Sequence, residues 1–341
     1  MAQRKKLAPL PVHPAHSLHT DYLCMVLPLL AWAIFLYGLR PLVVWLIAVV
    51  TAKVCSRIIS AMRSRRYDPT EDSSTVHASL LVMLLPATIP YYVVVITVAV
   101  GVFLAKEAFG GYGAYPFHPT AVSYTVAAVS WPEYVFAYSA PFQRNLALWG
   151  ELGNVQYTEN INSVMRAGGI PTVNQIDLVL GNYATAIGTA PVLIILSCGL
   201  FLFIRKRINL WVPVAFLLGA AAVAWCCPRI GEVQGLIWQN TAQRFQSVKF
   251  ELLSGAMLFS AVFLSCEPCT APKNTLSKLV YGLFWGVLTM MYRYYGTYET
   301  GVCFALLIMN AGSGYIDRVT AKLIAKYKGG DWSCGLSESS F

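Results

Sequence analysis

Ten apolar segments follow one another along this chain. They cover residues 22–38, 41–61, 75–86, 90–105, 118–131, 185–204, 208–226, 250–266, 275–292 and 299–314. A helix needs about 20 mainly apolar residues to cross the hydrocarbon core of a membrane. Charged residues make up 12% of the chain, about half of the roughly 25% found in soluble proteins. We therefore predict an all-α integral membrane protein with about ten transmembrane helices, which excludes a soluble enzyme and a disulfide-rich secreted domain.

The positive charges predict how the chain is oriented. With ten alternating spans, 18 of the 25 Lys and Arg residues lie on the side of the N-terminus, and cytoplasmic loops are enriched in these residues. Both termini are therefore predicted to be cytoplasmic. We expect an N-terminal arm (1–20), a transmembrane domain (21–317) that includes an extracytoplasmic loop region (132–184), and a C-terminal tail (318–341). Because the net charge of +9 comes from cations flanking the spans, membrane lipid is an expected partner and nucleic acid is not.

Two of the apolar segments, 75–86 and 118–131, are too short to cross a membrane and are bounded by Pro or Gly. Residues 79–90 and 254–272 also resemble each other weakly. In each, an apolar stretch ends at a Pro-containing break, and another apolar span follows. The two copies start from opposite sides, which predicts an inverted repeat with broken helices and a site near the membrane midplane. Tilted or interfacial helices, and chance similarity between apolar segments, are the alternatives.

Several short stretches together, in their order and spacing, resemble a known family. They include Asp72-Ser73-Ser74-Thr75-Val76, Lys106-Glu107-Ala108-Phe109-Gly110-Gly111-Tyr112-Gly113, Phe117-His118-Pro119, Gly168-Gly169-Ile170-Pro171, Leu180-Gly181-Asn182 and the segments 211–219 and 307–318. The chain resembles the D subunit of Rnf electron-transport complexes, which is related to the B subunit of sodium-translocating NADH:quinone reductase. The resemblance runs from about Leu10 to about Asp317.

The resemblance implies a subunit of an ion-translocating oxidoreductase in a bacterial or archaeal cytoplasmic membrane, rather than a stand-alone enzyme. Such a subunit holds FMN or riboflavin and couples electron transfer to movement of Na⁺ or H⁺. Its partners would be the other integral subunits, a flavin-bearing extracytoplasmic subunit and cytoplasmic iron–sulfur subunits. A flavin-free channel or transporter-like protein, and a structural scaffold subunit, are the alternatives.

The chain departs from the family at the position that carries a covalent flavin. The family attaches a flavin nucleotide to a Thr in the outward loop, and ungapped counting from Arg166 places that position at Asn160, which has no hydroxyl. Thr158 is the candidate for covalent FMN if the loop carries a gap. Two Asn positions of the family's glycine-rich motif appear here as Tyr115 and His118. These changes indicate a divergent member, for which covalent attachment is doubtful.

Gly110, Gly111 and Gly113, with Phe117 and His118, are the other candidates for cofactor binding. Glycine lets backbone approach a ligand closely, but it also supplies the positive φ that a tight turn needs. His118 is either a proton relay or a residue with a purely structural hydrogen bond.

Candidates for the ion path are the ionisable residues at helix breaks and helix ends, because such residues in a membrane domain mark ion pathways. They are Asp72, Lys106, Glu107 and Glu267. Helix capping or membrane anchoring at the water boundary is the competing explanation. Cys266 and Cys269 have the spacing of a metal or redox pair, but a metal site would need further ligands, so inert thiols are the default. No motif of hydrolytic or nucleophilic catalysis is present.

Overall fold

The computed structural model of the chain describes residues 15–64, 73–149, 155–229, 240–265, 267–296, 298 and 300–327. Within these ranges the protein is all-helical, and the one extended pairing is an isolated bridge between Ser139 and Tyr157. The prediction of an all-α membrane protein is confirmed.

The first half of the chain supplies five helices before the loop region. They are α1 (Ala15–Tyr37), α2 (Arg40–Met62), α3 (Ser74–Leu84), α4 (Tyr91–Val100) and α5 (Pro119–Ser130). After α4 the helix continues as a π-helical turn, η2 (Gly101–Lys106), and a 3-10 turn, η3 (Glu107–Phe109). Proline stands at the N-cap of α4 and at the first position of α5, where its missing N–H breaks no helical hydrogen bond.

The loop region and the second half complete the chain. The loop region carries the short helices α6 (Pro132–Val135), α7 (Ile161–Arg166) and α8 (Gln175–Leu180). The second half comprises α9 (Val192–Ile204), α10 (Trp211–Cys226), α11 (Thr241–Leu253), α12 (Met257–Phe259) continuing as the π-helical η4 (Ser260–Leu264), α13 (Thr275–Tyr295) and α14 (Val302–Tyr327).

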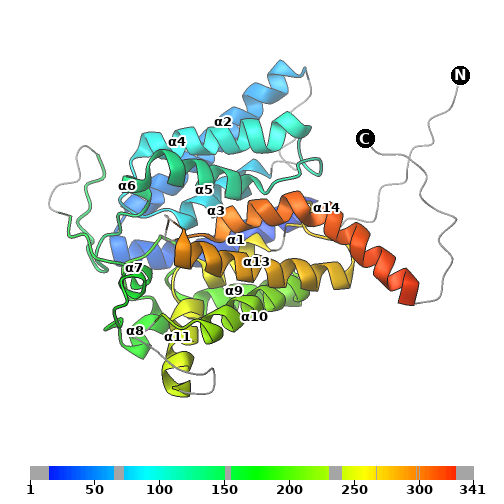
Figure 1. Cartoon of the computed structure of the whole chain (residues 1–341). Helices are drawn as coiled ribbons and strands as arrows, with labels where there is room; N and C mark the ends of the chain where they lie inside the picture. Colours follow the sequence, from blue (N-terminus) through cyan, green and yellow to red (C-terminus); the bar gives the residue numbers. More distant parts are fainter. Residues whose placement is uncertain are drawn as a thin grey trace, which may run out of the picture.

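The two halves share one packing pattern. α2 packs against α3 and α4, and in the same way α10 packs against α11 and α13. α4 then packs on α5 as α13 packs on α14. Corresponding helices of the two halves, α4 with α13 and α5 with α14, run in opposite directions along the bundle (Figure 1). This arrangement matches an inverted repeat, so we call residues 40–130 and 211–327 the first and second repeat.

Within the described ranges, three helical stretches are long and apolar enough to cross a membrane, namely Leu18–Tyr37, Arg40–Met62 and Tyr91–Phe109. A fourth candidate is the pair Thr241–Leu253 and Met257–Leu264, which is bent by 59° at its break. α3, α9 and α10 are apolar but shorter. Each of the ten predicted segments contains a helix, but several helices break before they complete a span. Non-helical backbone at membrane depth is tolerated where protein buries it.

The outer surface of the bundle carries large apolar side chains. Leu27, Val50, Leu104, Leu200 and Leu218 are each between 52% and 61% exposed. Exposed apolar surface on this scale is what a lipid environment accommodates and water does not.

The second repeat contains one helix whose start differs from the prediction. The segment expected to begin at residue 250 begins at Thr241. Its added turns carry Arg244, and the helix also carries Ser247 and Glu251, all at most 2% exposed. Hydropathy missed the start of this helix because its polar side chains face the protein interior.

Candidate functional site

A group of polar side chains lies where the break of the second repeat meets two elements of the first. We call His77, Tyr115, His118, Glu267 and Cys269 the inter-repeat cluster. His77 belongs to α3, Tyr115 and His118 lie in the loop before α5, and Glu267 and Cys269 follow η4. The two His residues and Tyr115 are at most 5% exposed, and Glu267 and Cys269 are half-buried.

Local sequence explains why these side chains converge. Pro119 occupies the first position of α5, so His118 takes the extended N-cap conformation, with φ −65° and ψ 116°. The π-helical turn η4 ends at Leu264, and Glu267 follows in the non-helical segment before α13. Insertions of π-helix into α-helices occur often at functional sites. Both π-helical turns, η2 and η4, therefore lead directly to the polar residues of this region.

Tyr115 links the two repeats through hydrogen bonds. Its hydroxyl donates to Glu267 Oε1 over 2.5 Å and lies 3.4 Å from His77 Nε2. On the other side of the His77 ring, Nδ1 lies 3.4 Å from Thr120 Oγ1. The rings of His77 and His118 stand nearly perpendicular, with centroids 5.5 Å apart.

His118 stands out among these groups because it is fully buried and neither ring nitrogen has a hydrogen-bond partner among the described residues. A buried polar group without a partner costs free energy, and such groups in native structures call for an explanation. The structural hydrogen bond that the sequence analysis offered as one role for His118 is therefore not formed in the described part of the chain.

Burial disfavours the charged forms of the acidic groups in the cluster. It raises the pKa of the Glu267 carboxyl, although the hydrogen bond from Tyr115 opposes this shift. Burial, and then the neighbouring Glu267 carboxylate, raise the pKa of the Cys269 thiol to about 12. The thiol is hydrogen-bonded to both Tyr115 and Glu267.

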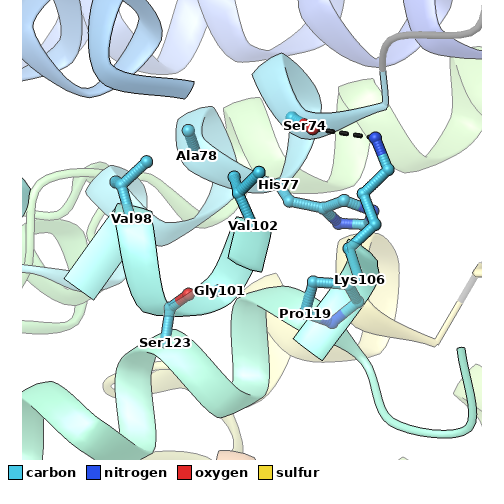
Figure 2. Close-up of a pocket in the computed structure, with 9 residues that line it drawn as sticks. All are labelled: Ser74, His77, Ala78, Val98, Gly101, Val102, Lys106, Pro119 and Ser123. Carbon is cyan, nitrogen blue, oxygen red and sulfur yellow. Dashed lines mark hydrogen bonds between the residues drawn. The ribbon is translucent and has the colours of Figure 1, made fainter. Parts of the chain in front are cut away.

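Lys106 approaches the cluster from the end of η2. Its Nζ donates to Ser74 Oγ over 2.8 Å and lies 3.6 Å from Glu107 Oε1, while Glu107 also pairs with Arg63 over 3.0 Å. Figure 2 shows Lys106 reaching across to Ser74 beside the ring of His77. Lys106 is 4% exposed, so it does not extend to solvent as a membrane-anchoring lysine does.

A small cavity adjoins this lysine. Ser74, His77, Lys106, Gly101 and Ser123 are among its lining residues (Figure 2). Its volume is about 10 Å³, and about 10–15 Å³ is the least that a water molecule needs. The cavity is therefore of a size for one water or small ion and far below the roughly 300–1,000 Å³ of an organic-ligand pocket.

The glycine-rich loop turns sharply just outside this cavity. Gly110, Gly111 and Gly113 have φ of 114°, 95° and 88°, which other residues rarely adopt. A Cβ at Gly113 would meet no atom within 4 Å, so that face of the loop is open. Phe117 is half-buried in the same loop. The turn alone accounts for these glycines, and the open face leaves room for a ligand.

Thr158 and Asn160 lie at the opposite end of the first repeat. The Thr158 N–H donates to Tyr138 O over 3.1 Å, just beyond α6. Thr158 is exposed, whereas Asn160 is 3% exposed and caps α7 by accepting a hydrogen bond from Asn162 N. The 12 residues of α5 put about 18 Å between this end and the glycine-rich loop. One flavin ring cannot contact both groups.

The second repeat holds a buried ion pair that the sequence analysis did not single out. Arg293 Nη1 of α13 lies 2.7 Å from Glu251 Oε2 of α11, and both side chains are at most 1% exposed. Arg293 Nη2 also donates to Ser254 O over 3.3 Å, and Arg229 lies 3.8 Å from Glu251. An acidic residue within an apolar segment was the available signal for Glu251.

Of the predicted site residues, the structure brings His118, Glu267 and Cys269 together and places Lys106 and Glu107 beside them. His77 and Tyr115 join them. The only signal for His77 was the rarity of His beyond the N-terminal arm, and the signal for Tyr115 was that it replaces an Asn of the family motif. Asp72 and Cys266 lie outside the described residues.

These features define a class: an all-α, multi-pass membrane protein with two inverted halves and a polar cluster at a helix break. The sequence matches the NQR2, RnfD, RnfE family over residues 13–326, and the chain belongs to that family.

Curated relatives are similar over nearly the whole chain. The D subunit of the proton-translocating ferredoxin:NAD(+) oxidoreductase complex of Clostridium ljungdahlii is 26% identical over 301 residues, which cover 87% of this chain and 88% of the relative. The D subunit of an ion-translocating oxidoreductase complex of Alcanivorax borkumensis is 28% identical over 310 residues, covering 86% and 87%. The corresponding protein of Yersinia pseudotuberculosis is 26% identical over 325 residues, covering 87% and 90%.

Proposed function

We propose that this chain is a membrane subunit of an Rnf-type ion-translocating oxidoreductase complex, in which it takes part in flavin-mediated electron transfer coupled to Na⁺ or H⁺ movement. The observation that carries the proposal is the family match over residues 13–326, together with relatives that are named as subunits of such complexes. The membrane is the cytoplasmic membrane of a bacterium or archaeon, with both termini cytoplasmic, as the distribution of Lys and Arg favours.

FMN or riboflavin is the cofactor of this proposal. The interior cavity of about 10 Å³ is too small for a flavin, so the ring would bind on the open face of the glycine-rich loop. Gly110, Gly111 and Gly113 would permit close approach there, with Phe117 at the edge. A bound flavin supplies the ability to take up one or two electrons.

A second flavin site fits the loop region. An open hollow of about 440 Å³ is lined by Phe142, Arg144 and Gln156, among others, and Gln156 is two residues from the exposed Thr158. Arg144 offers a cation for a phosphate. Asn160 has no hydroxyl and its side chain caps α7, so an ester of FMN would form at Thr158.

The ion path of the proposal runs past the buried polar residues of the first repeat. Lys106 and Glu107 form an ion pair on this path that is largely shielded from solvent. Glu267, at the helix break of the second repeat, is the next ionisable residue on the path. Asp72 keeps its candidacy from the sequence. Ionisable residues at membrane depth are costly and are retained where ions or protons pass.

The proposed partners are the other integral subunits, a flavin-bearing extracytoplasmic subunit and cytoplasmic iron–sulfur subunits. Affinity purification tests the proposal, because a tag on this chain would recover the intact complex from detergent-solubilised membranes. We expect the purified protein to show the absorbance spectrum of a flavin, and flavin bound at the glycine-rich loop to be released on denaturation. We also expect iron–sulfur subunits to co-purify. Flavin-free protein with donor-independent ion flux would instead favour a channel-like or scaffold role.

Covalent attachment has its own test. In-gel fluorescence that survives SDS in the wild type and disappears in Thr158→Val would support the ester at Thr158. Ser163→Ala, on the neighbouring helix α7, is the matched hydroxyl control and should keep the fluorescence. Absence of fluorescence in the wild type would contradict covalent attachment. The absorbance measurement would then decide whether flavin is bound noncovalently.

A further inference from the structure

Three side chains of the inter-repeat cluster form a set of metal ligands. His77, His118 and Glu267 each offer one ligand atom, and the three atoms lie within 4.8 Å of one another. They come from α3, the N-cap of α5 and the break after η4. The site therefore joins two elements of the first repeat to one of the second.

His118 supplies the independent observation that a ligand is missing. Its ring is fully buried beside His77, and neither nitrogen has a hydrogen-bond partner in the described part of the chain. An imidazole without a partner in such a place costs free energy. A metal ion bound to one nitrogen would remove that cost at the ligand atom, because neutral imidazole is a common metal ligand.

The residues around these three side chains are placed as supporting groups. Ligating His residues almost always have a partner on the second ring nitrogen, and ligating carboxylates are themselves hydrogen-bonded. Thr120 Oγ1 lies 3.4 Å from Nδ1 of His77 and Tyr115 Oη lies 3.4 Å from Nε2, so one of these contacts would support the ring while the ion replaces the other. Tyr115 also donates to Glu267 over 2.5 Å. The Cys269 thiol is hydrogen-bonded to Glu267 as well, so two neighbouring groups hold that carboxylate in place.

The ligand set selects the kind of metal. Two imidazoles, one carboxylate and a nearby thiol suit borderline divalent ions, whereas Mg²⁺ and Ca²⁺ prefer oxygen ligands. Zinc binds such groups at about 2.0–2.3 Å in tetrahedral geometry, which places His and carboxylate ligand atoms about 3.4 Å apart. The three ligand atoms lie within 4.8 Å of one another, so the side chains would have to close in by at most about 1.4 Å to reach that spacing. Lys106 opposes a cation, but it is held by Ser74 and lies 3.6 Å from Glu107.

We propose that His77, His118 and Glu267 bind one divalent transition-metal ion, for which Zn²⁺ is the best match, with the fourth coordination position left open to a water molecule. The ion fixes the break of the second repeat against α3 and α5 of the first. Glu267 then serves as a metal ligand, and Lys106 and Glu107 remain for the ion path. This inference does not depend on the proposed flavin or on an electron donor.

The test is metal binding by the full chain, purified in detergent within its complex through a tag that contains no histidine. After dialysis against a chelator, the sample is titrated with Zn²⁺, and with Co²⁺ as a spectroscopic probe. We expect one ion per chain, with the intense visible absorption of tetrahedral Co²⁺. His118→Asn and His77→Gln should weaken binding by about a hundredfold or more, because changing even a group that only supports a ligand typically costs about 10–100-fold in metal affinity.

His118→Asn carries the residue that the family motif has at this position, so we expect it to fold, and the unfolding temperature of the metal-free protein checks this. His19→Asn is the matched control. His19 is also buried, at 8% exposure, and packs edge-on against Tyr112, but it is not one of the three ligands. We expect its variant to bind the ion as the wild type does.

Two results would overturn the proposal. One is a wild-type protein that binds no ion above the level of His118→Asn. The other is binding that is lost in His19→Asn but unchanged in His118→Asn and His77→Gln. Both readouts are made without electron donor, so failure of the metal site and failure of the proposed electron transfer are distinguishable.

Discussion

The long central helices of the two repeats each end with a buried cation, and the two cations have very different partners. Arg293, at the end of α13, lies 2.7 Å from Glu251, and both are almost fully buried. Lys106, at the end of η2, donates to a neutral hydroxyl and shares Glu107 with Arg63. In the second repeat a buried carboxylate neutralises the cation directly. In the first repeat the cation lies near the inter-repeat cluster, where the His118 ring has no hydrogen-bond partner among the described residues.

This contrast separates a structural role from a functional one. The pair of Glu251 and Arg293 joins α11 to α13 within one repeat, where a fixed geometry serves the fold. The inter-repeat cluster joins different repeats at a helix break, and it contains an imidazole without a partner in the described part of the chain. We therefore expect changes at the ion pair to affect mainly stability, and changes at the cluster to affect mainly activity.

The largest effect on stability should come from Glu251→Gln. Removing one partner of a buried ion pair leaves an uncompensated charge and costs about 3–5 kcal/mol. Denaturant unfolding of the purified protein in detergent measures the loss. The double variant Glu251→Gln/Arg293→Met should recover much of it, since neither fully buried charge remains and Arg229 keeps its hydrogen bond to the backbone oxygen of residue 293. A single variant as stable as the wild type would remove the contrast between the two repeats.

An intermediate effect is expected from Tyr115→Phe. The change removes the hydrogen bond from Tyr115 to the half-buried Glu267 carboxylate and leaves it the Cys269 thiol as a donor, and loss of such a bond costs about 1–3 kcal/mol. Tyr134→Phe is the control, because Tyr134 is 39% exposed and should change stability by less than about 0.5 kcal/mol. Equal effects of the two variants in the same unfolding measurement would contradict a role for the hydrogen bond between the repeats.

The smallest effect should come from Lys106→Met. Methionine keeps most of the length of lysine, and Glu107 retains Arg63 as a partner, so no buried charge is stranded. We expect unfolding to change by about 1 kcal/mol or less, since replacing a buried charge by a packed apolar group is often near neutral. Arg293→Met should cost several times more, and a Lys106→Met loss as large would contradict the comparison.

Much of the fold could be predicted from the sequence because long apolar runs indicate membrane helices. All ten predicted segments contain a helix, and 75–86 and 118–131 are short, as expected. The start of α11 could not be found this way. Its buried polar side chains, Arg244 and Glu251 among them, resemble a solvent-exposed segment until their partners are known.

The candidate site could be predicted only in part. Lys106, His118 and Glu267 were accessible from the sequence because ionisable groups and proline breaks are visible there. The convergence of His77, His118 and Glu267 was not, because these residues are 41 to 190 positions apart and only the packing of the two repeats unites them. Burial also decides the role of Asn160, whose side chain caps α7.

The central claim is that the inter-repeat cluster serves function and the Glu251–Arg293 pair serves stability. Donor-driven ion uptake by proteoliposomes that contain the whole complex tests it most directly. In the metal-free protein, Glu267→Gln should unfold within about 1 kcal/mol of the wild type, because the Gln oxygen can still accept the hydrogen bond from Tyr115. The variant complex should nevertheless lose about tenfold or more of its uptake, because ionisable groups in membrane domains serve function. The Glu251→Gln/Arg293→Met variant should keep most of its uptake per folded complex. Full uptake in Glu267→Gln, with uptake abolished in the folded double variant, would contradict the account.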